Sequence, residues 1–473
     1  MLVTACSVVP AAMLLGLNRL GSLQGNRSVV LDDPLIQISE GLSMLQSFRI
    51  ESEAKVPSIW IERLGEQDAS KLWAQRDGEL WWQAWPQEGE PCLILRERML
   101  TAGFAGASEP RTFQAPESVS RHRGFVLLFA DALNRQTFLQ GFKPERVVSA
   151  PIEQFCFEQL NTTTAVLWKP SALASMAGPL TPLLSSAAYG CVAIEFRGRG
   201  LGWMGVVASR SLREASQRLL KPDPIDFLSG EFTKPFDAST PSDQSRLGVQ
   251  RPLISLQSHS ARTLFGSLLN RPLVRDGLEN NYGLGPNLRN QVLAAPLSLQ
   301  ILPNQQGPFQ AAVRLDLVLP SPNPEADSSL EAVSNRLKMR GLRSEERRLT
   351  PTKNGQSGEE ILWYGVKDNT KRLLGGWSWL DHGSAAESAG TASLQMTLAS
   401  RPDWKDSPMS FTKSGHLYAD VRPSQLSGLG LIGKSWPAPI RRAHRLELRI
   451  APLKGSATSH EDWRLISGYL LLP

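Results

Sequence analysis

Three segments of the chain share one order of predicted elements, and this order limits the folds that the sequence can adopt. Each segment opens with an apolar run typical of a buried strand, at 165–168, 253–256 and 416–421. Each run leads directly into a short polar turn that contains a serine. The shared order predicts an internal repeat.

The elements after each turn also follow one order. Ser171, Ser260 and Ser424 are the expected helix N-caps, because a hydroxyl there accepts a hydrogen bond from an otherwise unpaired amide of the first turn. The helix-like stretches that follow lie at 172–184, 261–273 and 425–432. The two strands that end each segment are expected at 189–196 and 202–208, at 296–302 and 309–319, and at 445–450 and 463–472.

The repeated order predicts the fold class. Strand-helix-strand-strand modules can pair edge to edge and place their helices on one face of a sheet. We therefore expect an α+β protein with mixed, largely antiparallel sheets and helices packed on one face. Residues 125–142 are interpreted as a partial fourth copy of the module.

Length and composition predict several structural parts. A chain of 473 residues exceeds what one compact core usually needs. Stretches rich in proline and polar residues, at 221–245 and 320–324, are typical of linkers. The expected parts are an apolar segment at 1–17, a linker at 18–33, an N-terminal α+β domain with the first repeat at 34–220, a flexible linker at 221–250, the second repeat at 251–320, and a C-terminal α+β region with the third repeat at 321–473.

Local patterns predict the elements outside the three segments. The alternating run at 58–63 predicts a strand, and 71–85 predicts a hairpin that turns at Asp77-Gly78. Asp131 is expected to cap a helix after a buried strand at 125–130. The remaining predicted elements are a charged helix-like segment at 327–349 and strands at 360–367 and 372–380.

The first residues predict the location of the protein. Residues 1–17 contain no charged residue, and the first basic residue, Arg19, follows them. This segment resembles the apolar core of a signal peptide or signal anchor. We therefore expect a membrane-anchored, extracytoplasmic protein, on the side of the periplasm or thylakoid lumen. The alternatives are a buried N-terminal helix in a cytoplasmic protein, and lipidation at Cys6.

The charged residues, the cysteines and the tryptophans limit the partners and the packing that the chain can have. The chain has 51 basic and 45 acidic residues, and because they are interspersed, nucleic acid is not an expected partner. The cysteines Cys92, Cys156 and Cys191 allow at most one internal disulfide and leave one thiol over. The tryptophans expected to pack within the sheet layers are Trp73, Trp81, Trp82 and Trp85.

No sequence motif assembles a known chemistry. Gly200, Gly202 and Gly205 match a dinucleotide-binding fingerprint, but 203–208 has a strand pattern where that fingerprint requires a helix. The run Asp381-His382-Gly383-Ser384 is interpreted as a polar loop, since no nucleophile elbow accompanies it. Two isolated S-x-x-K matches lie at 52–55 and 410–413. We expect no catalytic, cofactor-binding or metal-binding residue.

Some charged residues leave alternatives open. Glu195 and Asp316 lie within predicted strands, so the sequence alone neither supports nor excludes a carboxylate dyad. Basic residues gather at 336–348 and at 441–445. We interpret both groups as solvated faces with internal ion pairs. For an anchored protein, anionic lipid is the alternative partner of such a surface.

Four features of the layout carry a family resemblance. They are the apolar N-terminus, the strand-Pro-Ser-helix entries at 168–171 and 421–424, the strand sequence at 293–299, and the closing residues 463–473. The layout resembles a group of cyanobacterial exported or membrane-anchored proteins of unknown function, over roughly residues 124–473. The resemblance implies no activity, substrate or catalytic residue.

Together these patterns favour a non-enzymatic, extracytoplasmic, membrane-anchored scaffold or assembly protein, because repeated modules occur without a convergent polar constellation. One alternative is an exported hydrolase whose site is assembled from distant residues. Another is a binding protein for an anionic partner, in keeping with an isoelectric point near 9.2. The expected partners are the membrane through residues 1–17, anionic lipid headgroups, or a protein. No cofactor is expected.

Overall fold

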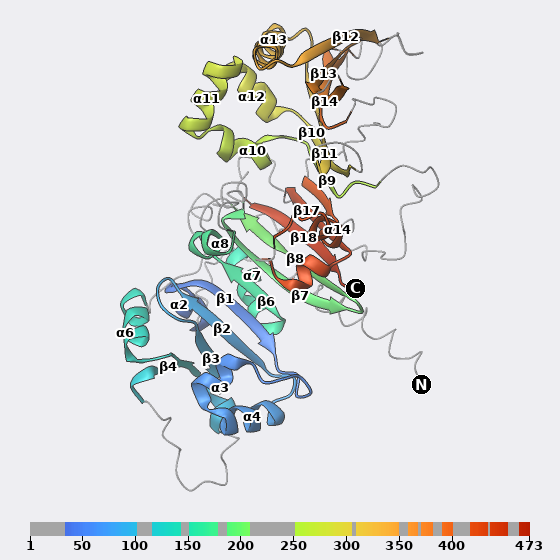
Figure 1. Cartoon of the computed structure of the whole chain (residues 1–473). Helices are drawn as coiled ribbons and strands as arrows, with labels where there is room; N and C mark the ends of the chain where they lie inside the picture. Colours follow the sequence, from blue (N-terminus) through green and yellow to red (C-terminus); the bar gives the residue numbers. More distant parts are fainter. Residues whose placement is uncertain are drawn as a thin grey trace.

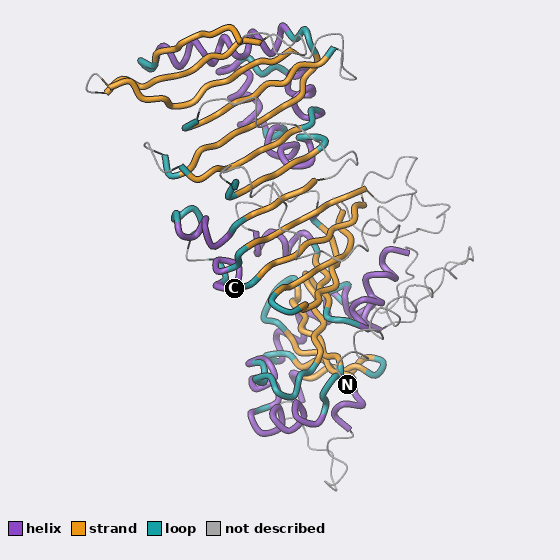
Figure 2. The backbone as a smooth tube through the Cα atoms, turned by 90° about the vertical axis from the view of Figure 1, so that its right-hand side faces the viewer, coloured by secondary structure: helices purple, strands orange, loops and turns teal. Residues whose placement is uncertain are grey.

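One open, 18-stranded antiparallel sheet contains every strand that the computed structural model describes. Figure 1 and Figure 2 show the strands following one another along the length of the molecule, with helices packed against them. The expected mixture of parallel and antiparallel pairs is therefore wrong for these strands. The described residues are 34–101, 116–142, 151–177, 187–208, 251–304, 309–349, 358–367, 370–381, 390–400, 417–433, 436–452 and 463–473.

The elements fall into three stretches of the chain. The first contains α2 (Pro34–Ser39), β1 (Leu42–Arg49), α3 (Ser58–Leu64), α4 (Glu66–Gln75), β2 (Leu80–Pro86), β3 (Cys92–Arg96), α5 (Glu97–Thr101), the 3-10 helix η3 (Pro116–Ser118), β4 (Val119–His122), β5 (Phe125–Leu128), α6 (Ala132–Gly141) and α7 (Pro151–Thr162). The second contains β6 (Ala165–Trp168), α8 (Pro170–Ala177), β7 (Tyr189–Arg197), β8 (Gly200–Ala208), β9 (Ile254–Ser258), α10 (Arg262–Leu269), α11 (Pro272–Tyr282), α12 (Pro286–Ala294), β10 (Leu297–Pro303) and β11 (Ala311–Pro320). The third contains α13 (Pro324–Met339), β12 (Arg343–Leu349), β13 (Gly358–Lys367), β14 (Thr370–Asp381), β15 (Thr391–Leu398), β16 (Leu417–Val421), α14 (Pro423–Gly428), α15 (Ala438–Arg442), β17 (Arg445–Pro452) and β18 (Trp463–Leu471).

The pairings place strands that are distant in the sequence side by side. The spatial order is β4, β5, β3, β2, β1, β6, β7, β8, β18, β17, β16, β9, β10, β11, β15, β14, β13 and β12. At about 4.8 Å between neighbouring strands, the sheet is about 80 Å wide. The last strand, β18, lies in the middle of the sheet beside β8.

Each of the three segments with a shared order forms a strand, one or more helices and two strands, as predicted. Their strands pair as the antiparallel series β6-β7-β8, β9-β10-β11 and β16-β17-β18. Residues 42–96 have the same order, with β1, then α3 and α4, then β2 and β3. By contrast, the suggested partial copy at 125–142 forms β5 and α6, and the next described element is another helix, α7.

Two strands predicted near the N-terminus are helical instead. The alternating run 58–63 belongs to α3, and the first half of the predicted hairpin belongs to α4. In α4, Ala69, Leu72 and Trp73 share one buried face at helical spacing, and this packing outweighs the period-2 pattern. Asp77-Gly78 turns the chain from α4 into β2 rather than between two strands.

Other local predictions are confirmed or corrected. Asp131 caps α6 by accepting a hydrogen bond from the Asn134 amide at 2.8 Å, as expected. The segment predicted as a helix at 327–349 is helical only to Met339 and then forms β12. Ser171 and Ser424 follow the proline that begins α8 and α14, so they lie inside the first turn rather than capping it. A proline suits that first position because it has no amide hydrogen to leave unpaired.

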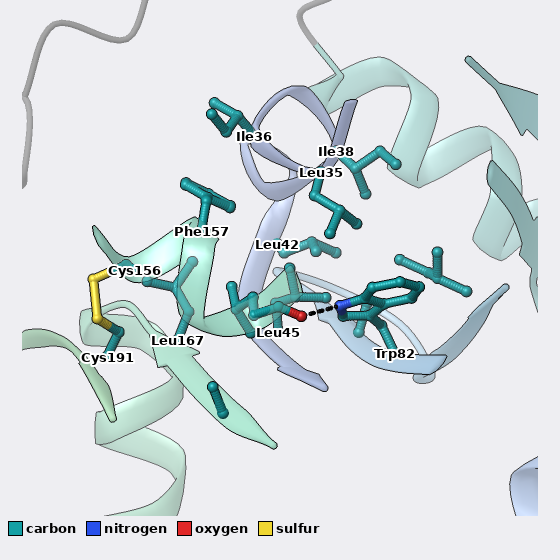
Figure 3. Packing of buried hydrophobic residues seen from close by; sticks show 14 of the residues in the cluster. Leu35, Ile36, Ile38, Leu42, Leu45, Trp82, Cys156, Phe157, Leu167 and Cys191 are labelled. Carbon is teal, nitrogen blue, oxygen red and sulfur yellow. Dashed lines mark hydrogen bonds between the residues drawn. A yellow bond between two sulfur atoms is a disulfide. The ribbon is translucent and has the colours of Figure 1, made fainter. Parts of the chain in front are cut away.

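Helices cover both faces of the sheet near β1, β2, β3 and β5, which corrects the expectation of one helical face. Trp82 and Ile94 pack with residues of α2, α6 and α7, whereas the adjacent Trp81 and Leu93 pack with α3 and α4. Since successive strand residues point to opposite faces, the two groups of helices lie on opposite sides. Figure 3 shows the first core, where the Trp82 indole donates a hydrogen bond to the Leu160 carbonyl at 2.9 Å. Trp73, Trp81 and Trp82 are buried as predicted, and Trp85 is partly buried.

One disulfide crosses this core. Cys156 on α7 is bonded to Cys191 on β7 (Figure 3), and Cys92 is a buried free thiol. The predicted limit of one bridge with one thiol left over is confirmed for these three cysteines. Burial raises the pKa of the Cys92 thiol to about 12, so this side chain stays protonated near neutral pH and packs as a small apolar group.

The other predicted parts differ in what the structure describes. The apolar segment 1–17 and the linkers at 18–33 and 221–250 lie outside the described residues. None of the helices in the described ranges is both long enough and apolar enough to cross a membrane. Strands of the predicted N-terminal domain, second repeat and C-terminal region all belong to the one sheet.

Replacing both Cys156 and Cys191 with alanine should destabilise the fold. The bridge joins residues 35 positions apart, and a loop of this size predicts a loss of about 2–4 kcal/mol. Urea denaturation followed by tryptophan fluorescence measures the change. A reducing agent should lower the midpoint of the wild type and leave that of the double variant unchanged. Equal midpoints for wild type and variant under oxidising conditions would contradict the prediction.

Candidate functional site

The strand register places polar side chains side by side across eight strands. Strand residues that alternate with this set, such as Leu317, Trp377 and Leu394, pack with a helical layer. Its buried residues include Ala261 directly before α10, Leu288 of α12 and Ala326 of α13. The set therefore lies on the opposite face, and we call it the polar row. From β13 to β17 its members are Glu360, Ser378, Gln395, Asp316, Ser298, Gln257, Tyr418 and Arg449.

A buried ion pair lies in the part of the polar row on β11. The Arg314 Nε lies 3.2 Å from Asp316 Oδ2, and the Gln395 amide donates a hydrogen bond to Asp316 Oδ1 at 2.6 Å. The Asp316 side chain is 1% exposed. Burial raises the pKa of Asp316, while the Arg314 guanidinium and the Gln395 amide oppose this shift by favouring the charged carboxylate.

Two atoms beside this pair have no hydrogen-bond partner among the residues that the structure describes. They are Ser378 Oγ and Gln395 Oε1, and both side chains are fully buried. Ser378 is directly opposite Gln395 in the register of β14 and β15. A buried polar atom without a partner is costly, so a group that can hydrogen-bond both atoms, such as a water molecule, would stabilise this position.

A second charged cluster lies on β16 and β17. Asp420 and Glu447 are directly opposite each other, and Arg445 binds both carboxylates. The Arg445 Nη2 atom lies 2.8 Å from Asp420 Oδ2 and 2.5 Å from Glu447 Oε1. Burial raises the pKa of Glu447, and Arg445 opposes that shift. The hydrogen bond to Asp420 raises the pKa of Arg445, so the guanidinium stays charged and holds two carboxylates together.

Aromatic and basic groups surround the second cluster. Burial, followed by the charges of Glu447 and Asp420, raises the pKa of Tyr418 to about 12. The Arg449 guanidinium lies 5.6 Å from the centre of the Tyr418 ring, within cation-π range. Burial lowers the pKa of Arg422. Tyr418 therefore remains a neutral phenol near pH 7, able to donate a hydrogen bond but not to act as a base.

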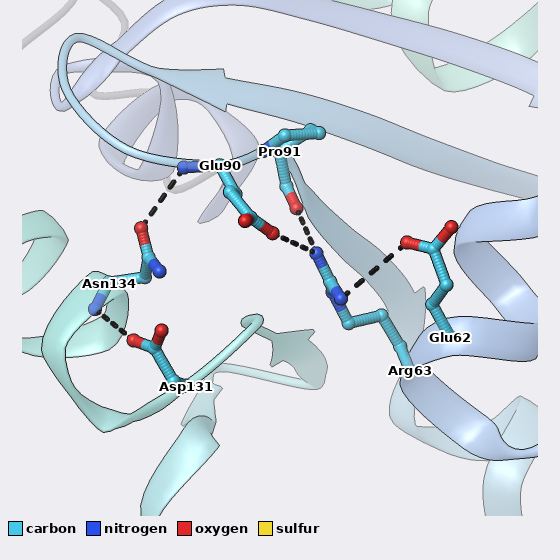
Figure 4. Close-up of polar contacts among 6 residues, drawn as sticks. All are labelled: Glu62, Arg63, Glu90, Pro91, Asp131 and Asn134. Carbon is cyan, nitrogen blue, oxygen red and sulfur yellow. Dashed lines mark hydrogen bonds and ion pairs between the residues drawn. The ribbon is translucent and has the colours of Figure 1, made fainter.

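A third polar cluster, around Arg63, has a structural role. Figure 4 shows Arg63 of α3 contacting Glu62, Glu90 and the Pro91 carbonyl, the last at 3.1 Å. Asn134 of α6 accepts a hydrogen bond from the Glu90 amide at 3.0 Å. These contacts join the loop between β2 and β3 to helices on both faces of the sheet. The backbone amide of Asn134 donates a hydrogen bond to Asp131 and thereby lowers the pKa of that carboxyl.

The structure separates the residues that the sequence left as a possible dyad. Glu195 is on β7 and Asp316 is on β11, seven strand spacings or about 34 Å apart in the sheet. They therefore form no dyad. The neighbouring carboxylates are Asp420 and Glu447, which the sequence reasoning missed. A usable signal was present, because Arg445, Glu447 and Arg449 alternate with apolar residues along one predicted strand.

The other sequence motifs gain no chemistry from the structure. Gly200, Gly202 and Gly205 lie within β8, which is a strand as predicted rather than a loop before a helix. Ser52 and Lys55 are exposed in a turn after β1. Asp381 ends β14, whereas His382, Ser384 and the pair 410–413 lie outside the described residues.

The histidines show no metal-binding arrangement where the structure describes them. His122 contacts the Gln37 side chain at 2.7 Å, and burial lowers its pKa. His259, directly after β9, and His444, directly before β17, are both exposed. Across the described ranges no group of three or more His, Cys, Asp or Glu side chains could hold a metal ion.

Comparisons with known proteins give no relative. No protein-family model, no curated protein and no solved structure matches the chain. The geometry of the polar row and its two charged clusters is therefore the basis for a functional proposal.

Replacing Arg314 with methionine should destabilise the fold in a pH-dependent manner. At pH 7 the change leaves Asp316 as a buried, unpaired carboxylate, at a cost of about 3–5 kcal/mol. The pKa of Asp316 in the folded protein is already raised. The free energy of unfolding therefore falls as the pH rises from the pKa of Asp316 in the unfolded chain through its pKa in the folded protein. The loss should therefore be smaller at pH 4 than at pH 7, as measured by urea denaturation at both values.

The matched control is the double variant R314M/D316N, which removes the charge as well as its partner. It should recover most of the stability lost in Arg314→Met at pH 7. If the loss in the single variant does not depend on pH, Asp316 is not the group left unpaired.

Proposed function

We propose that this protein is a non-enzymatic, extracytoplasmic scaffold or assembly protein held at a membrane by residues 1–17. The observation that carries this proposal is the single open antiparallel sheet, about 80 Å wide at about 4.8 Å per strand. Its two charged clusters are ion-paired, Arg314 with Asp316 and Arg445 with both Asp420 and Glu447, as in a structural surface. Within the described residues each end strand of the sheet, β4 and β12, pairs along one edge, and such an extended sheet suits the binding of other proteins.

We infer that twelve of the 18 strands belong to four copies of one strand-helix-strand-strand unit. The copies are residues 42–96, 165–208, 254–320 and 417–471. Their joints support this inference, because equivalent strands meet at each one. First strands meet at β1–β6 and at β16–β9, and last strands meet at β8–β18. Such joints relate neighbouring units by local two-fold axes normal to the sheet, as in a symmetric assembly.

The disulfide supports an extracytoplasmic location. Disulfides form and persist in oxidising compartments and are rare in the reducing cytoplasm. The Cys156–Cys191 bond lies in a core where both side chains are buried. Such a bond fits a chain exported by an apolar N-terminal segment. It also agrees with the resemblance to exported or membrane-anchored cyanobacterial proteins, which stays a prediction.

An exported hydrolase is the second proposal, and Asp420 with Glu447 is the observation that favours it. Two adjacent carboxylates, one with a raised pKa, are the groups that many glycoside hydrolases use. Arg445 binds both, which favours a structural ion-pair network over catalysis. Arg445 is thereby neutralised, so the basic group at 441–445 gives weaker support to binding of an anionic partner.

Fractionation of cells that express the full native chain tests the scaffold proposal. The protein should stay in the membrane pellet after an alkaline carbonate wash, because an apolar segment in the bilayer is not extracted by high pH. Protease should digest the body only from the extracytoplasmic side. A soluble cytoplasmic protein would contradict the proposal.

A variant without residues 1–17 is the matched control. It should lose membrane retention and remain in the cytoplasm, since the proposal assigns both export and anchoring to this apolar segment. Glu447→Gln tests the alternative in the same cells. If cells with Glu447→Gln at normal protein abundance have the same phenotype as cells that lack the whole gene, the result would favour the hydrolase.

A further inference from the structure

The two ends of the sheet differ in how well they could accept another strand. One end is β4, with 4 residues, and the other is β12, with 7 residues. Within the part of the chain that the structure describes, β12 pairs only with β13. The outer edge of an end strand presents backbone amides and carbonyls that can continue the ladder. At β12 this edge is long enough for specific pairing.

The charges of β12 are ordered in a way that suits pairing with itself. The strand contains Glu345, Glu346, Arg347 and Arg348 in succession. In an antiparallel pair of two β12 strands centred on Glu346, each Glu345 is opposite Arg347 of the second copy. Opposite charges that face each other across strands stabilise a pair, whereas like charges destabilise it. This register gives two such Glu–Arg pairs on the same face as the polar row, because Arg347 is opposite Glu360.

The side chains needed for these pairs are accessible. The Arg347 and Glu345 side chains are 53% and 36% exposed. Glu345 also contacts Lys371 and, at 3.6 Å, Arg347 of its own chain. A carboxylate accepts several hydrogen bonds, so these contacts leave room for a second arginine. Glu346 is exposed on the other face, where the exposed Arg348 is its nearest neighbour along the strand.

The sheet already uses this kind of joint. Equivalent strands meet antiparallel at β1–β6, β8–β18 and β16–β9. A β12–β12 joint between two chains has the same geometry, with a two-fold axis normal to the sheet. Charged residues on an end strand commonly serve only to prevent pairing. The order of signs argues for the opposite role here, because the two Glu345–Arg347 pairs outnumber the one like-charge pair, formed by the two Glu346 side chains at the centre.

We propose that β12 is a self-recognition edge, through which two copies of this chain join into one continuous antiparallel sheet. The proposal rests on the scaffold function and names a second copy as the partner. A single strand pair buries less area than a standard stable interface. The dimer is therefore weak in solution, and a common membrane would favour it by raising the local concentration of the chains.

Sedimentation of the purified full chain in mild detergent tests the pairing. The average mass should rise from one chain toward two with protein concentration, and high salt should weaken the association. Glu345→Arg alone and Arg347→Glu alone should each lower the association constant at least tenfold. The double variant E345R/R347E should restore it, because the same pairs form with exchanged charges. A monomer at all concentrations, or a double variant as weak as the single ones, would overturn the proposal.

Cysteine cross-linking tests the register. Glu346 is opposite itself, and opposed Cα atoms lie about 4.5–5.5 Å apart, within the range that a disulfide spans. Glu346→Cys should therefore form a covalent dimer on mild oxidation. Glu345→Cys should not, because diagonal partners are about 7–8 Å apart. A mixture of Glu345→Cys and Arg347→Cys chains should cross-link with each other.

The controls separate this proposal from the scaffold proposal. The wild type must give no covalent dimer under the same oxidation, and Ser120→Cys on β4 at the other end of the sheet should give none. Efficient cross-linking through β4, or a dimer without cross-linking at residue 346, would overturn the β12 joint. A cytoplasmic protein that still dimerises through β12 would refute the membrane anchor alone. A washed-membrane protein that remains monomeric would refute the joint alone.

Discussion

Antiparallel pairing between strands distant in the sequence is the constraint on which the rest of the structure depends. Every strand inside a sheet must have hydrogen-bond partners at both edges, because unpaired backbone groups are costly once buried. Short segments such as β6-β7-β8 leave two open edges each. The chain closes them by joining β1 to β6, β8 to β18 and β16 to β9. These joints turn separate units into one sheet and bring the C-terminal strand to its centre.

The same strand register determines which charged side chains lie next to each other on the sheet. Because opposed residues share a face, Asp316 meets Gln395 and Asp420 meets Glu447 across neighbouring strands. Arg314 and Arg445 then balance these carboxylates at short range. Burial raises the pKa of Asp316 and of Glu447, so removal of either arginine would leave a poorly solvated anion. On the face of the polar row, the carboxylates of Asp316, Asp420 and Glu447 are thus each neutralised by an arginine close by.

Local sequence patterns were sufficient to predict many of the helices and strands but not all of them. The strands β7, β10 and β17 were predicted because apolar runs, turns and helix-like stretches agreed with one another. The segments at 58–63 and 71–75 were misread as strands, since short apolar runs fit both periods and only packing against Trp81 selects the helix. The second helical face was also missed, because a strand such as β3 with four buried residues in a row gives no alternation to show which face is covered.

The sequence by itself determined the α+β class, the shared order of three segments and the limit of one disulfide among Cys92, Cys156 and Cys191. These are properties of composition and of the order of residues along the chain, which need no knowledge of contacts between distant residues. The tertiary structure alone decided which edges join, that Cys156 bonds to Cys191, and that Asp420 lies opposite Glu447. Such facts depend on pairing between strands far apart in the chain. No local pattern encodes that pairing, because any exposed edge with compatible length and charge could accept the same partner.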